Sequence, residues 1–144
     1  KPLAVSAGAW YQGTAIDPSQ FGIAVSPKPG VEFAQIEQAM DDVIAGLAQA
    51  PVRAEDLERT KTQMIAESVY AQDSQTTLAR WYGAAITVGM SVDDVRAWPD
   101  RIRAVTAEQV RDAARTWLDK KRSATGYLVK DTSAITAKRE EKRS

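Results

Sequence analysis

The acidic side chains of this chain come in adjacent pairs, an arrangement that could bind a metal ion or share a proton. Carboxylates do such chemistry only when further polar groups converge on them. Each pair here has a simpler role as a solvated helix surface, a helix start or part of a polar tail. We therefore expect none of them to be catalytic or to bind metal. The four pairs are Asp41-Asp42, Glu55-Asp56, Asp93-Asp94 and Glu140-Glu141.

Histidine and cysteine are both absent from the 144 residues. The chain thus lacks the commonest zinc ligands and the usual general base of hydrolysis near neutral pH. It also has no thiolate or disulfide chemistry. No phosphate-binding loop, dinucleotide-binding glycine pattern or nucleophile elbow is present. We expect a chain that contains no catalytic residue, binds no cofactor and holds no metal.

Arginines gather around the last helical segment and alternate with acids. This spacing is typical of a salt-bridged surface rather than a phosphate site. The basic residues are Arg101, Arg103, Arg111 and Arg115, and the acids are Asp100, Glu108 and Asp112.

Aromatic residues give the strongest hint of a contact surface. Trp10 and Tyr11 are adjacent near an expected turn, next to Gly8 and Gly13. Neighbours in a strand point to opposite faces, so this pair must face at least partly outward. Trp10 and Tyr11 are our candidates for an interface or a substrate contact, with local packing as the open alternative. We expect the other large aromatics to fill a core between helices and sheet; they are Trp81, Tyr82, Trp98 and Trp117.

Composition indicates one ordinary globular domain. Hydrophobic residues make up 44% and charged residues 26% of the chain, and 19 basic side chains balance 19 acidic ones. A neutral chain has no electrostatic footprint for nucleic acid. No apolar run approaches the roughly 20 residues that cross a bilayer, so we expect no membrane span. We expect a periplasmic location, with the cytoplasm as the alternative. The lack of cysteine is compatible with either compartment.

Hydrophobic periodicity predicts two strands followed by several helices and a last strand. Residues Leu3–Trp10 and Phe21–Ser26 alternate with a period of two, which indicates an antiparallel hairpin. Helical spacing begins at Phe33 and ends before Pro51. A second helix starts near Ala54 and is interrupted or bent at Asp73-Ser74.

Capping signals mark the later helices. Gly89 suits a left-handed helix end, and Ser91 with Asp94 resembles a capping box. Thr106 with Gln109 opens a helix to Asp119, on which we expect Trp117 to be buried and Arg111 to lie on the opposite face. Residues Ala124–Val129 are predicted to form the last strand. The expected fold is α+β, an antiparallel or mixed sheet with helices on one face, over residues 1–130. Residues 131–144 are expected to be a polar, disordered tail.

The ordered set of segments resembles pitrilysin/insulysin-type zinc metallopeptidases, the short bacterial members in particular. The hairpin and the acidic amphipathic helix fit that pattern in order, and the resemblance covers the chain apart from its tail. The segments that carry it are Leu3-Ala-Val-Ser-Ala-Gly-Ala-Trp10, Phe21-Gly-Ile-Ala-Val-Ser26, Leu57-Glu-Arg-Thr-Lys61, Arg80-Trp-Tyr-Gly-Ala-Ala-Ile86, Val95 to Val110, Trp117-Leu-Asp119 and Gly126-Tyr-Leu-Val129.

The resemblance implies the second, C-terminal domain of one peptidase half, incomplete at its N-terminus. In that family the first domain carries an inverted zinc motif, His-x-x-Glu-His, which this chain lacks. Zinc is then expected in the parent protein and not on this chain. Partner halves of the family place a substrate-binding Tyr in the strand that corresponds to Leu3–Trp10, and no Tyr stands there. That departure favours the zinc-bearing half.

Three functions follow as alternatives. The first is a domain that forms the wall of an enclosed peptide-cleaving chamber and supports the zinc-bearing domain, with a second peptidase half or subunit and a peptide as partners. The second is a non-catalytic structural subunit of the same fold. The third is a peptide- or protein-binding module that uses Trp10 and Tyr11 as anchors. Because the resemblance implies a missing opening strand, we also expect an exposed sheet edge that allows dimerisation.

Overall fold

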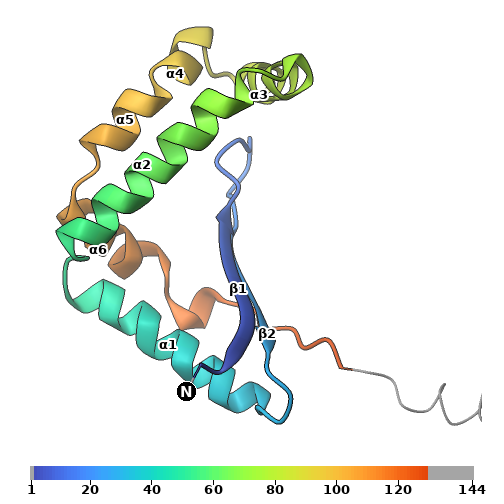
Figure 1. Ribbon diagram of the computed structural model, residues 1–144, viewed down its shortest axis with the longest axis vertical. Coiled ribbons are helices and arrows are strands. Elements are labelled where there is room, and N and C mark those ends of the chain that lie inside the picture. The colour runs from blue at the N-terminus through green and yellow to red at the C-terminus, as the bar shows by residue number, and fades with distance from the viewer. Residues whose placement is uncertain (1, 130–144) are drawn as a thin grey trace, which may run out of the picture.

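The computed structural model describes residues 2–129, as one hairpin followed by helices (Figure 1). The expected tail, residues 131–144, lies outside the described residues. The elements in chain order are β1 (Ala4–Tyr11), β2 (Phe21–Pro27), α1 (Phe33–Gln49), α2 (Ala54–Ala71), α3 (Gln75–Thr87), α4 (Val92–Arg96), α5 (Trp98–Ala104), α6 (Ala107–Trp117) and the short 3-10 turn η1 (Lys120–Arg122).

The two strands pair antiparallel, which confirms the predicted hairpin. Tyr11 lies opposite Phe21, and the register continues to Ser6 opposite Ser26, followed by a bulge between Ala4 and Ser6. The loop is closed by a hydrogen bond from the Gln12 N–H to the Gln20 carbonyl, at 3.2 Å. The fold is α+β, as the sequence predicts, with α1, α2, α5 and α6 on the same side of the hairpin (Figure 1).

Helix boundaries follow the capping residues. Ser91 and Thr106 open α4 and α6 with reciprocal capping boxes to Asp94 and Gln109, as predicted. Ser74 caps α3 by accepting the Thr77 N–H, so the chain breaks between α2 and α3 rather than bending there. These hydroxyl and carboxylate caps satisfy the backbone N–H groups that a helix start leaves free. Gly89 has φ of +86° after α3, the left-handed conformation expected for it.

The helices pack in pairs and enclose very little. α1 contacts α6 and β2, α2 contacts α5, and α3 contacts α4. Among residues 2–129 the buried apolar side chains are Ile36, Ala85 and Ala114, and the buried polar one is Ser68. A core of one isoleucine and two alanines supplies little hydrophobic stabilisation, since this scales with the apolar area removed from water. The apolar faces of these elements are therefore available to other surfaces.

The prediction of a strand at Ala124–Val129 is wrong, because these residues are not in a strand in the structure. A strand needs a neighbouring ladder, and this segment lies instead against the start of α1. The Tyr127 ring packs on Phe33 with 5.0 Å between centroids. Lys120, which precedes this segment, pairs with Asp41 of α1. Leu128 and Val129 remain exposed.

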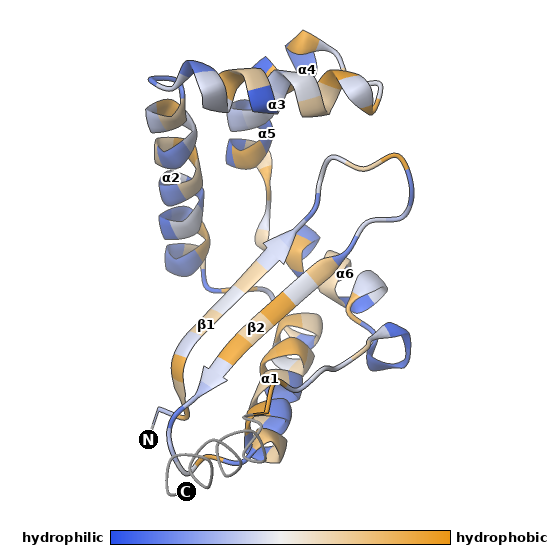
Figure 2. Ribbon diagram, turned by 90° about the vertical axis from the view of Figure 1, so that its right-hand side faces the viewer, coloured by the Kyte–Doolittle hydropathy of each residue, from blue (hydrophilic) through white to orange (hydrophobic). Residues whose placement is uncertain are grey.

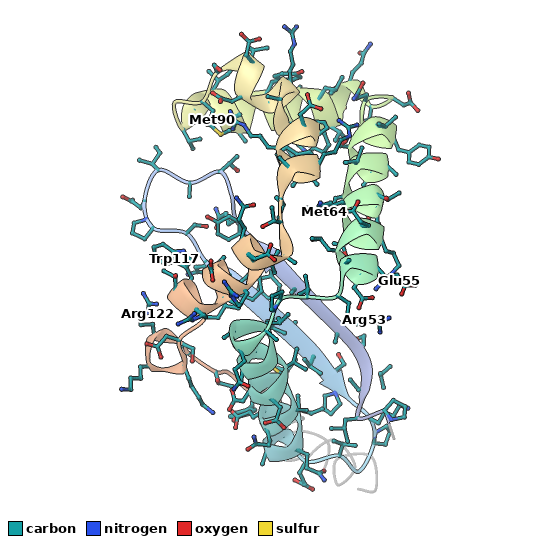
Figure 3. All side chains as sticks on the ribbon, turned by 90° about the vertical axis from the view of Figure 1, so that its left-hand side faces the viewer. Arg53, Glu55, Met64, Met90, Trp117 and Arg122 are labelled. Atoms are coloured by element: carbon teal, nitrogen blue, oxygen red, sulfur yellow. The ribbon has the colours of Figure 1, made fainter. Side chains whose placement is uncertain are left out.

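The predicted orientation of α6 is also wrong. Trp117 is 70% exposed, whereas Arg111 is only 28% exposed at its side chain. The inward face of α6 is centred on Ala114, so Trp117, the last helical residue, falls at its flank. The Arg122 guanidinium lies 5.9 Å from the centre of the Trp117 ring instead (Figure 3). Of the other aromatics expected in a core, Trp98 and Tyr82 are half-buried and Trp81 is exposed.

Candidate functional site

The loop end of the hairpin carries four large apolar side chains that are open to solvent. Their exposed fractions are 54% for Trp10, 68% for Tyr11, 82% for Ile16 and 47% for Phe21. We call these four residues the hairpin-end surface. The loop that joins β1 to β2 projects beyond the strands in Figure 2, away from α1. Side chains of this size at one end of a sheet are typical of a contact surface.

Strand register places the members of this surface. Tyr11 and Phe21 are directly opposite each other, so their side chains share one face of the sheet. Trp10 points to the other face, where its cross-strand neighbour is Gly22. A Cβ atom added to Gly22 would lie 2.2 Å from the Trp10 ring carbon Cζ2. The indole therefore lies directly on the glycine backbone, a position that only a residue without a side chain allows.

Sequence reasoning found two of these four residues and missed the others. Phe21 was identified as the start of a strand, but its place opposite Tyr11 depends on the length of the loop. Ile16 lies in that loop, where no periodicity assigns a face. The signal that could have found it is its isolation, since it is the large aliphatic side chain between Gly13 and the Asp17-Pro18 turn.

Each acidic pair within residues 2–129 has ordinary neighbours. Asp41 pairs with Lys120, and Asp42 accepts a hydrogen bond from Gln38 at 2.8 Å. Glu55 pairs with Arg53, and Asp56 with Arg59 (Figure 3 labels Arg53 and Glu55). The remaining described pair splits in the same way, Asp93 to Arg96 and Asp94 to Arg101. The fourth pair, Glu140-Glu141, lies outside the described residues.

Among the described carboxyl groups, Asp94 has the largest pKa shift, and the cause of that shift is structural. The Ser91 N–H and hydroxyl, and then Arg101, lower the pKa of Asp94 from 3.8 to about 2. Those same bonds form the cap of α4. A carboxylate held ionised by a cap has no proton to give, so it is unsuited to acid–base work near neutral pH.

Zinc does not fit the donor set of this chain. The described residues contain no cluster of three or more His, Cys, Asp or Glu side chains that could hold a metal ion. The three acidic pairs within residues 2–129 are engaged with arginine, lysine and glutamine. Protein zinc sites use imidazole or thiolate ligands in most cases, and neither residue type occurs here.

Two other surface features are smaller. A shallow polar hollow on α6 is lined by Asp112, Arg115 and Thr116.

No helix in the described part of the chain is long and apolar enough to cross a membrane. Exposed apolar side chains also occur along the helices, among them Val43, Met64, Val69, Tyr70, Ile86 and Val92.

A solved structure has a similar fold. The structure is similar to the inactive peptidase domain of a candidate zinc protease from Bordetella parapertussis, with a TM-score of 0.71 and 18% sequence identity. The match covers 90% of this chain and 72% of that chain. No family model matches the sequence, and the search of curated proteins found no match. At this identity the likeness concerns the fold.

Proposed function

We propose that this chain is the metal-free α+β domain of a zinc metallopeptidase of the pitrilysin type. In this role it forms part of the wall of a peptide-cleaving chamber and supports the zinc-bearing domain. Zinc, the catalytic base and the activated water belong to the parent protein's other domain. The chain contributes shape and contact surface.

One observation carries this proposal: a fold shared with an inactive peptidase domain over 90% of the chain, in a sequence without histidine or cysteine. The fold supports the class, and the composition supports the proposal that this chain is the part that does no chemistry. The nearly coreless packing agrees with this role, because a domain with so few buried side chains gains stability from surfaces that cover it. Within residues 2–129, three apolar residues are buried.

The hairpin-end surface is our candidate for the contact with the zinc-bearing domain, a second peptidase half or the peptide. Aromatic residues at the centre of an interface carry much of the binding free energy. Trp10 and Tyr11 point to opposite faces, so the surface can contact two bodies at once or insert between them. The alternative, a peptide-binding module, rests on the same four residues.

The test begins with the gene that encodes this sequence. A His-x-x-Glu-His motif encoded upstream of Lys1, or in an adjacent gene, supports the proposal. The longer protein or the subunit pair is then assayed on an unstructured peptide, with and without chelator. We expect chelator-sensitive hydrolysis that falls at least about tenfold in Trp10→Ala, if the interface contributes about 1.4 kcal/mol or more. Trp117→Ala, an exposed tryptophan outside the hairpin-end surface, is the matched control.

Two other results would separate the alternatives. A parent that assembles through this chain but lacks the zinc motif would make it a structural subunit of the same fold. Capture of peptides by the 144-residue chain alone, lost in Trp10→Ala, would make it a binding module. For location we propose the periplasm, with the cytoplasm as the alternative, and fractionation of the source cells decides between them.

A further inference from the structure

The outer edge of β1 has the features of a strand that pairs with another chain. β1 reads Ala-Val-Ser-Ala-Gly-Ala-Trp-Tyr, without a charged residue or a proline. Exposed edge strands are usually protected by charges, prolines or a covering element, because their free N–H and C=O groups attract further strands. β1 carries no charge and no proline, and no strand covers its outer edge within residues 2–129. Its one irregularity is the bulge between Ala4 and Ser6, at the end of the strand away from the hairpin loop. β2, in contrast, is contacted by α1 and ends at Pro27.

The register shows which backbone groups are free. Gln12 donates its N–H to Gln20, and inward and outward groups alternate along an antiparallel strand. The backbone N–H and C=O groups of Trp10 and Gly8 therefore point toward β2, as those of Gln12 do. The corresponding groups of Ala7, Ala9 and Tyr11 point away from β2. Within residues 2–129 no strand pairs with this edge. Figure 2 shows β2 on one side of β1 and no strand on the other.

We propose that the outer edge of β1 pairs antiparallel with β1 of a second copy, joining two hairpins into one four-stranded sheet. The two-fold axis passes through Gly8. Ala7 of each copy then lies opposite Ala9 of the other, and the outward groups of both residues form the ladder hydrogen bonds. The regular pairing extends from Ser6 to Trp10, because Val5 lies in the bulge between Ala4 and Ser6.

Charge and side-chain size select a second copy as the occupant. An isologous contact requires a surface complementary to itself, and an uncharged strand of small residues centred on glycine meets that requirement. The chain carries a formal net charge of zero, so two copies do not repel each other at long range. This proposal concerns the backbone edge of β1 and does not depend on the proposed peptidase role.

The absence of native cysteine makes a direct test possible. Gly8 has no atom within 4 Å of an added Cβ, so Gly8→Cys fits the hairpin. At the two-fold axis the two Cα atoms would be about 4.5 Å apart, the spacing of a non-hydrogen-bonded pair, which is within the range of a disulfide. We expect Gly8→Cys to form a covalent dimer under mild oxidation at low protein concentration. Gly46→Cys on α1, which also meets nothing within 4 Å, is the control expected to stay monomeric.

The unmodified chain should elute at twice its mass of 15.7 kDa in size exclusion with light scattering. Ala9→Pro removes an outward N–H without touching the β1–β2 ladder, and Ala9→Lys places a charge on the edge. Both variants should be monomers with unchanged far-ultraviolet circular dichroism. If Ala9→Pro fails to fold, the oligomeric state of Ala9→Lys and the cross-linking of Gly8→Cys still test the proposed strand pairing.

A monomeric chain, or a dimer that survives Ala9→Lys and does not cross-link through Gly8→Cys, would overturn the proposal. Neither result would affect the proposed function, which rests on the fold and on a sequence without histidine or cysteine.

Discussion

At the scale of single residues, Gly22 is the position on which the hairpin-end surface depends. The Trp10 indole occupies the space of a Gly22 side chain, 2.2 Å from the Cβ position. An aromatic ring over a cross-strand glycine covers backbone that would otherwise be open to water. The same contact fixes where the indole points, so a small change at Gly22 moves a large side chain.

We expect Gly22→Ala to displace the Trp10 ring while the hairpin remains. The cost should be at most about 1 kcal/mol, the value of one cross-strand pair. In protein labelled with fluorotryptophan, one of the four tryptophan resonances should shift, the one that disappears in Trp10→Phe. Gly8→Ala, with open space at its Cβ, should shift none of them. An unmoved Trp10 resonance in Gly22→Ala would show that the ring does not lie on the glycine in solution.

Asp94 gives a second residue-scale prediction, through pH. Its folded pKa is lowered to about 2 from 3.8 by Ser91 and Arg101. The stabilisation is therefore complete above 3.8 and is lost as the pH falls toward 2, because the unfolded carboxyl binds its proton first. Replacing Asp94 with Asn should remove this part of the acid dependence. Denaturant titrations at several pH values between 2 and 5 measure it; identical slopes in both proteins would contradict the assignment.

At the scale of elements, patterns along the chain located nearly every helix start. Local chemistry is sufficient there, because a capping box such as Thr106 with Gln109 acts within four residues. The face of a helix and the pairing of a strand depend on what lies beside them. Periodicity predicts Trp117 in a core, and the described residues do not form that core around it. Ala124–Val129 was assigned to a ladder, but the structure packs Tyr127 on Phe33.

The hairpin-end surface was half predictable for the same reason. That Trp10 and Tyr11 face outward follows from their adjacency in a strand. The addition of Phe21 requires the register, and the addition of Ile16 requires the path of the loop. Both are set by the loop closure between Gln12 and Gln20, which hydrophobic periodicity does not reveal.

Helix packing leads to a contrast between α1 and α6. Ile36 on α1 is 8% exposed and Trp117 on α6 is 70% exposed. We expect Ile36→Ala to cost about 2–5 kcal/mol, the range for a buried aliphatic side chain. Trp117→Ala should cost only about 0.5–1 kcal/mol, the value of an exposed cation–π contact. Urea unfolding of both variants tests this, and a larger effect at Trp117 would place that residue in an interface that forms in solution.

At the scale of the whole molecule, the fold resembles that of an inactive peptidase domain, and the sequence lacks the residue types that most often bind zinc. The likeness to an inactive peptidase domain has a TM-score of 0.71 at 18% sequence identity, and it concerns the fold. Within residues 2–129 no group of three or more His, Cys, Asp or Glu side chains could hold a metal ion. The proposed role as a chamber wall is compatible with both observations, since a wall needs surfaces and contacts rather than titratable groups.

The last prediction tests the proposal that zinc binding and catalysis belong to another domain. We expect the purified 144-residue chain to bind no zinc with micromolar affinity in calorimetry, because it has neither imidazole nor thiolate. Its described carboxylate pairs are also engaged with arginine, lysine and glutamine. The same preparation should not hydrolyse an unstructured peptide, whereas the zinc-bearing parent should. Asp41→Asn combined with Asp94→Asn, which alters two of the pairs, should leave the calorimetric trace unchanged. One saturable zinc site that these substitutions weaken would instead assign metal chemistry to this domain.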